Sequence, residues 1–77
     1  MDEIRIAKLG MSTVDVDVVS ILIHVGQLLA VGDPLCEVET EKAQVTLEAD
    51  RPGTVTEIVV KEGETYVVGD IICRLQT

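Results

Sequence analysis

Lys42 is the residue of this sequence whose type and setting best suit a chemical role. It stands in the run Glu37-Val38-Glu39-Thr40-Glu41-Lys42-Ala43, between an acidic residue and a small apolar one. A lysine amine is a nucleophile and can form a covalent bond through its nitrogen. Whether Lys42 is such a site, or one more solvated lysine, depends on how the chain presents it.

The residues around Lys42 predict a β-hairpin with this lysine at its tip. Apolar and polar residues alternate over 36–40 and again over 43–48, which is the period of a β-strand. With Glu41 and Lys42 as a two-residue loop, apolar residues face one another across the strands, as a correct register requires. The expected pairs are Thr40/Ala43, Val38/Val45 and Cys36/Leu47 inward, and Glu39/Gln44 and Glu37/Thr46 outward.

The loop itself breaks a local rule. Two-residue hairpin loops favour Asn-Gly or Asp-Gly, because the matching turns need positive φ. Glu41-Lys42 offers neither, so we expect either a strained turn or another turn type. A broken local rule at an exposed tip is typical of a functional position.

The other reactive side chains suit structural roles. Cys36 and Cys73 fall on the inward phase of their strands, which predicts small buried thiols. The alternative is a disulfide between them, which requires their Cα atoms to lie within about 7 Å of each other. His24, the only histidine, is expected in solvent beside a turn. No Cys-His spacing suggests a metal site. The acidic residues near Lys42 lack a cleft that would perturb a carboxyl pKa, so we expect no catalytic residue.

The elements that must position Lys42 come from an internal repeat. Residues 18–40 match residues 55–77 without gaps, at an offset of 37, with eight of 23 positions identical. Each copy is predicted as a strand, a Gly turn, a short strand, a Gly-Asp turn and a strand. Two copies are too few for a solenoid, so we expect two halves of one barrel or sandwich, related by an approximate twofold axis.

Some segments have individual predictions. Residues 4–9 are expected as an opening strand and residues 14–23 as a longer one. Gly26 and Gly63 are expected in tight turns with positive φ. The run Arg51-Pro52-Gly53-Thr54 is typical of a type II turn. Half of the apolar run 28–31 is expected in the core. For Leu28 and Val31 two interpretations stay open, simple local packing or a docking or self-association patch.

Composition predicts an all-β domain and argues against several functions. Val, Ile and Thr supply 27 of the 77 residues, a strong strand bias. The formal charge of −8 argues against binding to nucleic acid or anionic membranes. No apolar run approaches membrane-spanning length, and the acidic start is unlike a signal peptide. We expect residues 1–77 to form a single domain located in the cytoplasm, or in the mitochondrial matrix of a eukaryote.

The residues around Lys42 resemble the attachment sequence of lipoyl domains, E-x-E-T-D-K-A, with Glu41 in place of the commoner Asp. The run Lys8-Leu9-Gly10-Met11-Ser12 resembles the opening of acyltransferase lipoyl domains, and the Gly and Gly-Asp turns fall in the family's order. The whole chain therefore resembles the biotinyl/lipoyl attachment family, and in particular the lipoyl domains of 2-oxo acid or acetoin dehydrogenase acyltransferases.

This resemblance implies a fold, a cofactor and partners. The fold would be all-β, a flattened barrel (barrel-sandwich hybrid) of two small antiparallel sheets. Lipoate would be covalently attached to Lys42, carrying acyl groups and electrons without catalysis by the domain itself. The implied partners are a lipoate ligase or lipoyl transferase, a thiamine-diphosphate-dependent decarboxylase and dihydrolipoyl dehydrogenase. The residues implied in recognition by these enzymes are Glu39, Thr40, Glu41, Ala43, Gly10, Met11 and Ser12.

Three other functions stay open. Biotinyl domains share the fold but usually flank the lysine with methionines. An unmodified barrel-sandwich interaction module typically lacks a lysine at the hairpin tip. The glycine-cleavage carrier is normally longer and bears extra helices. Val16, Ile21 and Gln27 also depart from the Gly, Trp and Asp that lipoyl domains often have, which leaves open the complex that this domain would serve.

Overall fold

Eight short β-strands make up the regular structure of this computed structural model, which describes residues 2–7 and 15–77. They are β1 (Asp2–Arg5), β2 (Asp15–Ile21), β3 (Leu28–Leu29), β4 (Pro34–Glu39), β5 (Gln44–Glu48), β6 (Gly53–Ile58), β7 (Thr65–Val67) and β8 (Ile71–Gln76). The strand bias of the composition is thus confirmed. Within these residues no helix has the length and apolar character needed to cross a membrane.

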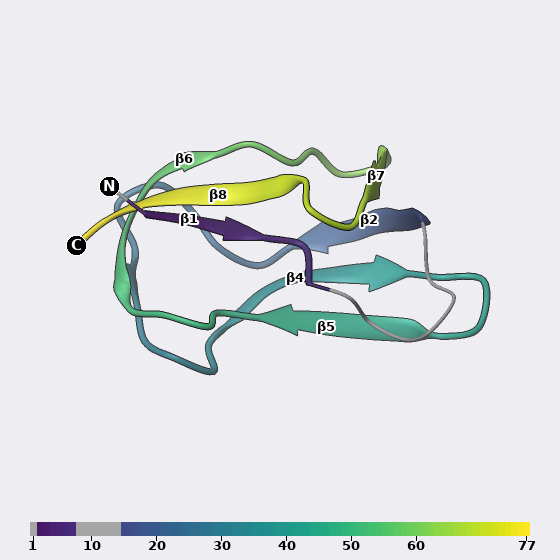
Figure 1. Cartoon of the computed structure of the whole chain (residues 1–77), viewed down its shortest axis with the longest axis horizontal. Coiled ribbons are helices and arrows are strands. Elements are labelled where there is room, and N and C mark those ends of the chain that lie inside the picture. Colours follow the sequence, from purple (N-terminus) through teal and green to yellow (C-terminus); the bar gives the residue numbers. More distant parts are fainter. Residues whose placement is uncertain (1, 8–14) are drawn as a thin grey trace.

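The strands form two four-stranded antiparallel sheets (Figure 1). One sheet has the order β1-β8-β6-β3 and the other the order β5-β4-β2-β7. The molecule measures 33 × 22 × 17 Å. Stacked sheets lie about 10 Å apart, so the shortest dimension has room for two sheets and little else. The prediction of an all-β flattened barrel is confirmed.

The internal repeat appears in the structure as matching ladders. Val18 pairs with Val38 between β2 and β4, and Val55 pairs with Leu75 between β6 and β8, 37 residues further on. Both ladders have a register shift at the corresponding place. The edge pairs correspond in the same way, β3 with β6 in one sheet and β7 with β2 in the other. The predicted twofold relation is confirmed.

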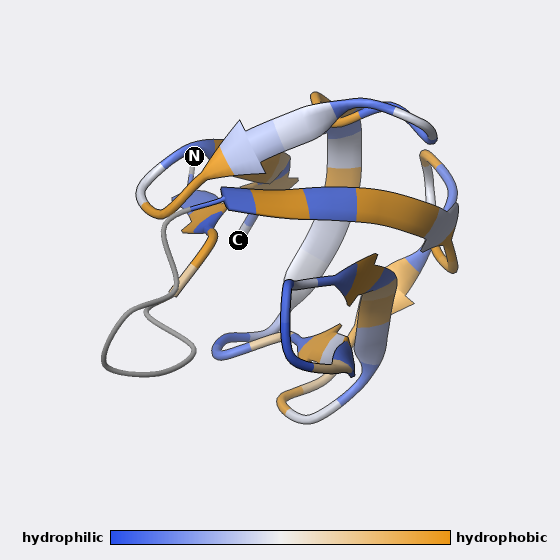
Figure 2. Cartoon of the chain, turned by 90° about the vertical axis from the view of Figure 1, so that its right-hand side faces the viewer, coloured by the Kyte–Doolittle hydropathy of each residue, from blue (hydrophilic) through white to orange (hydrophobic). Residues whose placement is uncertain are grey.

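The core lies between the sheets and is almost entirely aliphatic. Hydrophobic and hydrophilic residues alternate along the strands, as Figure 2 shows. Within the described residues, no polar or charged side chain is buried, so the core is held by apolar burial and close packing. The largest fully buried side chains are those of Leu29, Leu35, Ile72, Leu75, Val16, Val18, Val38, Val55, Cys36 and Cys73.

The two cysteines are part of this core. Cys36 and Cys73 are both buried and both free, so the expected role as core thiols is confirmed and the disulfide is not formed. Burial raises the pKa of the Cys36 thiol to about 11, with a smaller contribution from the charge of Cys73. Burial also raises the pKa of Cys73. Protonated, buried thiols are poor nucleophiles, so neither cysteine suits a reactive role.

The boundaries of two predicted strands were wrong. The opening strand covers Asp2–Arg5 rather than residues 4–9, of which 8 and 9 lie outside the described residues. Its pairing with β8 shifts in register between Ile4 and Arg5, and Ile6 then exchanges hydrogen bonds with Gly69 and Asp70, just before β8. The second strand ends at Ile21 rather than at residue 23. The Ile21 N–H donates to the Glu62 carboxylate at 2.8 Å, although the Leu22 N–H still donates to the Leu35 carbonyl of β4 at 2.9 Å.

The prediction of a type II turn at Arg51–Thr54 was also wrong. Gly53 has a φ of +155°, far from the value of about +80° that this turn requires. It is instead the first residue of β6 and pairs with Leu29. A Cβ on Gly53 would lie 3.0 Å from the Leu75 Cβ, so glycine is needed here for the close approach of β6 to β8.

The glycine turns of the two repeats were predicted correctly. Gly26 and Gly63 have φ values of +94° and +84°. Each donates its N–H to a strand of the other repeat, Gly26 to the Val55 carbonyl at 2.7 Å and Gly63 to the Val18 carbonyl at 2.8 Å. These bonds join the halves of the barrel to one another.

Candidate functional site

The β4–β5 hairpin carries Lys42 at the end of the molecule opposite the two termini (Figure 1). Its register agrees with the prediction, since Val38 pairs with Val45 and Glu39 with Gln44. Val38 is fully buried. The inner face of the hairpin therefore belongs to the core, and packing holds the strands that lead to the tip.

The turn at the tip is closed by Thr40. Its N–H donates to the Ala43 carbonyl at 2.8 Å, and its hydroxyl donates to the same carbonyl at 2.9 Å. The hydroxyl also accepts the N–H of Ala43 at 3.1 Å and that of Lys42 at 3.3 Å. Neither Glu41 nor Lys42 has a positive φ, which excludes the usual type I′ and II′ turns. The expectation of another turn type is confirmed, and it is a turn bonded by a threonine side chain.

The side chain of Lys42 is exposed, and no ion pair within residues 2–7 and 15–77 engages its amine. Its surroundings are acidic. Glu39 and Glu41 flank it and are exposed, and Asp17 of β2 pairs directly with Glu39 of β4. Like charges on directly opposed strand residues oppose folding. The lysine is thus a cation beside a surface of excess negative charge.

A hollow of about 270 Å³ lies at the tip of the hairpin. It is lined by Glu39, Thr40, Glu41, Lys42, Ala43 and Gln44. Six consecutive residues of one hairpin cannot enclose a ligand, whereas binding pockets bury most of the surface of the molecules they hold. The arrangement suits a covalent bond to the amine better than a non-covalent site.

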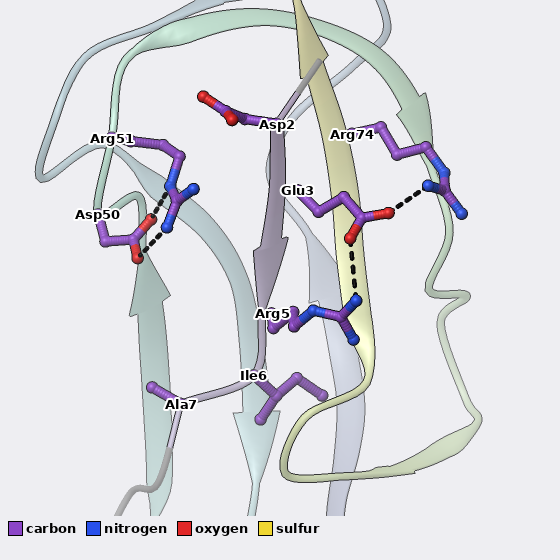
Figure 3. A pocket seen from close by; sticks show the side chains of 8 residues that line it. All are labelled: Asp2, Glu3, Arg5, Ile6, Ala7, Asp50, Arg51 and Arg74. Atoms are coloured by element: carbon purple, nitrogen blue, oxygen red, sulfur yellow. Dashed lines mark hydrogen bonds and ion pairs between the residues drawn. The ribbon is translucent and has the colours of Figure 1, made fainter.

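A larger groove, of about 560 Å³, lies between β1 and the segment that joins β5 to β6 (Figure 3). Its lining residues are Asp2, Glu3, Arg5, Ile6, Ala7, Asp50, Arg51 and Arg74. Each of the three arginines contacts a carboxylate. Arg51 contacts Asp50 at 3.0 Å, while Arg5 contacts Glu3 at 2.9 Å and Arg74 contacts the same Glu3. Three basic and three acidic side chains balance, so the groove offers no excess charge to an anion.

The remaining predicted site residues fall into two groups. Gly10, Met11 and Ser12 lie outside the described residues, so their role stays a prediction. Glu39, Thr40, Glu41 and Ala43 all lie at the tip with Lys42. His24 is exposed, as expected. In the described part of the chain, no group of three His, Cys, Asp or Glu side chains is placed to hold a metal ion.

The apolar run 28–31 contributes one residue to the core rather than the expected half, because Ala30 is also exposed. Leu29 is buried, while Leu28 and Val31 are 76% and 66% exposed.

The structure also adds a role that sequence reasoning missed, the use of the Thr40 hydroxyl inside the turn. The available signal was a threonine before a two-residue loop that contains no glycine, asparagine or aspartate.

Comparison with known proteins identifies the family to which the chain belongs. The family model Biotin_lipoyl, described as "Biotin-requiring enzyme", matches residues 2–75. This chain belongs to the biotin/lipoyl attachment family.

Several relatives are components of 2-oxo acid dehydrogenase complexes. The lipoamide acyltransferase component of the branched-chain alpha-keto acid dehydrogenase complex of Bacillus subtilis (strain 168) is 31% identical over 77 residues, which are 100% of this chain and 18% of the relative. The dihydrolipoyllysine-residue acetyltransferase component of the pyruvate dehydrogenase complex of Staphylococcus aureus (strain Mu50 / ATCC 700699) is 32% identical over 73 residues, 95% of this chain and 17% of the relative. The chain therefore spans less than a fifth of the length of these relatives.

A mouse relative matches more closely over a shorter stretch. The mitochondrial pyruvate dehydrogenase protein X component of Mus musculus is 47% identical over 51 residues, which are 65% of this chain and 10% of the relative.

A solved structure shows the same fold. The solution structure of the lipoyl domain of the 2-oxoglutarate dehydrogenase complex from Azotobacter vinelandii superposes with a TM-score of 0.70 and 25% identity, covering 96% of each chain. The likeness to this lipoyl domain thus extends over nearly the whole chain. The chain has the fold of a lipoyl domain and is related to 2-oxo acid dehydrogenase acyltransferases.

Proposed function

We propose that Lys42 carries a covalently attached lipoyl group and that residues 1–77 form a single lipoyl domain of an acyltransferase component. In this role the domain carries acyl groups and electrons between the active sites of a 2-oxo acid or acetoin dehydrogenase complex, without catalysis of its own. The observation that carries the proposal is the placement of Lys42, exposed at the tip of a well-packed hairpin and at the far end from the termini.

Attachment needs only the chemistry of an exposed amine. The neutral Nζ of Lys42 attacks the carbonyl carbon of a lipoyl group that is activated as an acyl adenylate or a thioester. A C–N bond forms as the bond to the adenylate or thiol breaks, and one proton leaves Nζ. The amide product is uncharged, so the formal charge of the chain changes from −8 to −9.

The residues at the tip fit such a group. Nothing in the described structure shields the Lys42 side chain, and its amine is not held in an ion pair. When attached, a lipoyl group supplies a dithiolane that takes up an acyl unit and two electrons. The hairpin holds the anchoring backbone in place, and a tethered arm meets successive active sites at high effective concentration.

The proposed role also determines the partners. A lipoate ligase or lipoyl transferase would modify Lys42, and a thiamine-diphosphate-dependent decarboxylase and dihydrolipoyl dehydrogenase would use it, in the cytoplasm or the mitochondrial matrix. Among the described residues, Glu39, Glu41 and Ala43 are the recognition candidates, because all three are exposed at the tip, and Gly10, Met11 and Ser12 stay in the predicted set. Replacing Glu41 with alanine should slow modification, and an unchanged rate would remove this residue from the set.

Biotin is the second candidate group, because the matching family model is described as biotin-requiring. The neighbours of Lys42 favour lipoate, since they are Glu41 and Ala43 rather than the methionines usual in biotinyl domains. The relatives named above include a lipoamide acyltransferase and a dihydrolipoyllysine-residue acetyltransferase, which agrees with this preference.

Intact mass spectrometry tests the proposal directly. The protein is incubated with lipoate and a lipoate ligase, or with biotin and a biotin ligase, in the presence of ATP. We expect one lipoyl increment on the wild-type protein and none on Lys42→Arg. Lys61→Arg, which changes another exposed lysine, should be modified like the wild type. A biotin increment, or no lipoyl increment from an active ligase, would overturn the assignment of lipoate.

A further inference from the structure

The β4–β5 turn lacks the usual means of closing a two-residue hairpin. Such turns need a positive φ at one or both central residues, which Gly, Asn and Asp tolerate. Glu41 and Lys42 occupy these positions, and neither has a positive φ. The strands are nevertheless paired as far as Glu39 and Gln44. Another group must therefore hold the turn.

The Thr40 side chain takes the place of a backbone group. Two residues that flank such a loop ordinarily exchange two backbone hydrogen bonds. Here the Thr40 N–H makes one of them, to the Ala43 carbonyl at 2.8 Å. The Ala43 N–H donates to the Thr40 hydroxyl at 3.1 Å instead of to a carbonyl. The same hydroxyl accepts the Lys42 N–H at 3.3 Å and donates to the Ala43 carbonyl at 2.9 Å.

These contacts use the full capacity of the hydroxyl, which has one donor and two acceptor positions. All three bonds lie within the turn, so the hydroxyl has no position left for a partner enzyme unless the turn opens. Thr40 is also partly buried, whereas Glu41, Lys42 and Ala43 are exposed. The hydroxyl is thus placed to shape the turn rather than to be read from outside.

We propose that Thr40 is a positioning residue for attachment, whose hydroxyl fixes the backbone of Lys42 and Ala43 and so sets the direction in which the lysine side chain leaves the hairpin. The inference rests on the proposed function of Lys42 as the attachment site. It replaces the expectation that Thr40 is a recognition contact.

Such positioning has a kinetic consequence. The Lys42 side chain is long and exposed, so a turn with several backbone conformations presents the amine in several directions. The attaching enzyme binds the competent conformation, and apparent affinity falls in proportion to the fraction of molecules that hold it. Loss of the hydroxyl should therefore raise KM for the domain and leave kcat unchanged, because the bound complex is the same.

The test compares three variants as substrates of a lipoate ligase. Thr40→Val keeps the branched shape and lacks the hydroxyl, while Thr40→Ser keeps the hydroxyl. Thr46→Val makes the same chemical change on the exposed face of β5, where the threonine side chain makes no hydrogen bond to any described residue. Steady-state rates at varied domain concentration give kcat and KM. In parallel, NMR measures the exchange of the Lys42 and Ala43 amide protons with solvent.

We expect Thr40→Val to raise KM about tenfold with kcat within about twofold of the wild type. Thr40→Ser and Thr46→Val should keep the wild-type KM. The Lys42 and Ala43 amides should exchange about tenfold faster in Thr40→Val alone. A wild-type KM in Thr40→Val, or an equal increase in Thr46→Val, would overturn the inference.

Two further results separate this inference from the proposed function. If the wild-type protein is lipoylated and Thr40→Val is lipoylated equally well, the role of Thr40 is overturned while that of Lys42 stands. If the wild-type protein is not lipoylated, the proposed function and with it the kinetic role fall. Should Thr40→Val fail to fold, amide exchange in the wild-type protein tests the inference instead. Exchange of the Ala43 amide as fast as in an unstructured peptide would overturn the turn held by the hydroxyl.

Discussion

Replacing Gly53 with alanine should destabilise the fold, although the residue lies beside the C-terminal strand, at the end of the molecule opposite the β4–β5 tip. Gly53 has a φ of +155°, which residues with a side chain rarely adopt. An alanine Cβ would lie 3.0 Å from the Leu75 Cβ and 3.2 Å from the Gln76 carbonyl oxygen. Neither contact is with the free end of a flexible side chain, so relief requires β6 and β8 to move apart.

The expected cost has two parts. The unfavourable φ costs about 1 kcal/mol for alanine relative to glycine, and overpacking of a closely packed site costs about 1–3 kcal/mol. The free energy of unfolding should therefore fall by about 2–4 kcal/mol. Gly69 separates the two parts. Its φ is +98° and no atom lies within 4 Å of its Cβ position. Gly69→Ala should therefore cost only the conformational part, about 1 kcal/mol.

The internal repeat suggests a partial rescue. In the other half of the repeat, Val16 is equivalent to Gly53 and Val38 is equivalent to Leu75. One half therefore combines two valines, and the other combines glycine with the larger leucine. The Leu75 Cδ1 lies 3.2 Å from the added Cβ. In a double-mutant cycle, Gly53→Ala with Leu75→Val should be less costly than the sum of the single changes by about 1 kcal/mol.

Urea unfolding followed by circular dichroism measures these free energies. Lipoylation of Lys42 in Gly53→Ala, measured well below the unfolding midpoint, should proceed at the wild-type rate, because the tip of the hairpin is remote from β6 and β8. If Gly53→Ala costs no more than Gly69→Ala, the close approach of the two strands is not the reason for glycine at this position, and the reasoning fails.

Two other regions give predictions. Stability should fall by about 2–3 kcal/mol as pH rises from about 9 to about 11, because the folded state keeps the Cys36 proton, with its pKa of about 11, after the unfolded chain has lost it. Urea unfolding across this range should show the loss, Cys36→Ala should reduce it, and a flat wild-type profile would contradict the assigned pKa. The thiols of Cys36 and Cys73 should react with a disulfide reagent such as DTNB only on unfolding, and rapid reaction of the native protein would show that they are accessible. Leu28→Thr should change the free energy of unfolding by less than about 0.5 kcal/mol, because Leu28 is 76% exposed and its repeat equivalent is Thr65; a loss above about 1 kcal/mol would show that Leu28 contributes to packing.

Much of the hairpin could be predicted because its signals are local. The alternation on either side of Lys42 has the period of a strand, and a shift of one residue would turn the apolar face outward. The pairs of Val38 with Val45 and Glu39 with Gln44 therefore followed from the sequence. The repeat was equally visible, and its offset of 37 recurs in both ladders.

The failures share a different cause. The Pro-Gly pair predicts a turn at Gly53, yet glycine is needed there because the backbone passes close to Leu75, which is 22 residues further along the chain. The end of β2 was placed too late because its hydrophobic pattern continues, while the Ile21 N–H is taken by Glu62, also remote in sequence. Strand boundaries and close contacts depend on partners that a local pattern does not contain.

The sequence by itself determined that Lys42 lies at the tip of a hairpin between two symmetric halves, because strand periodicity and repeat spacing are properties of the chain alone. Only the tertiary structure decided how the tip is closed and where glycine is indispensable. The Thr40 hydroxyl could have faced solvent in another turn, and it holds the turn at Lys42 because the paired strands bring Ala43 within 3.1 Å of it. Such contacts exist only once the strands have paired, which is why the residues alone did not reveal them.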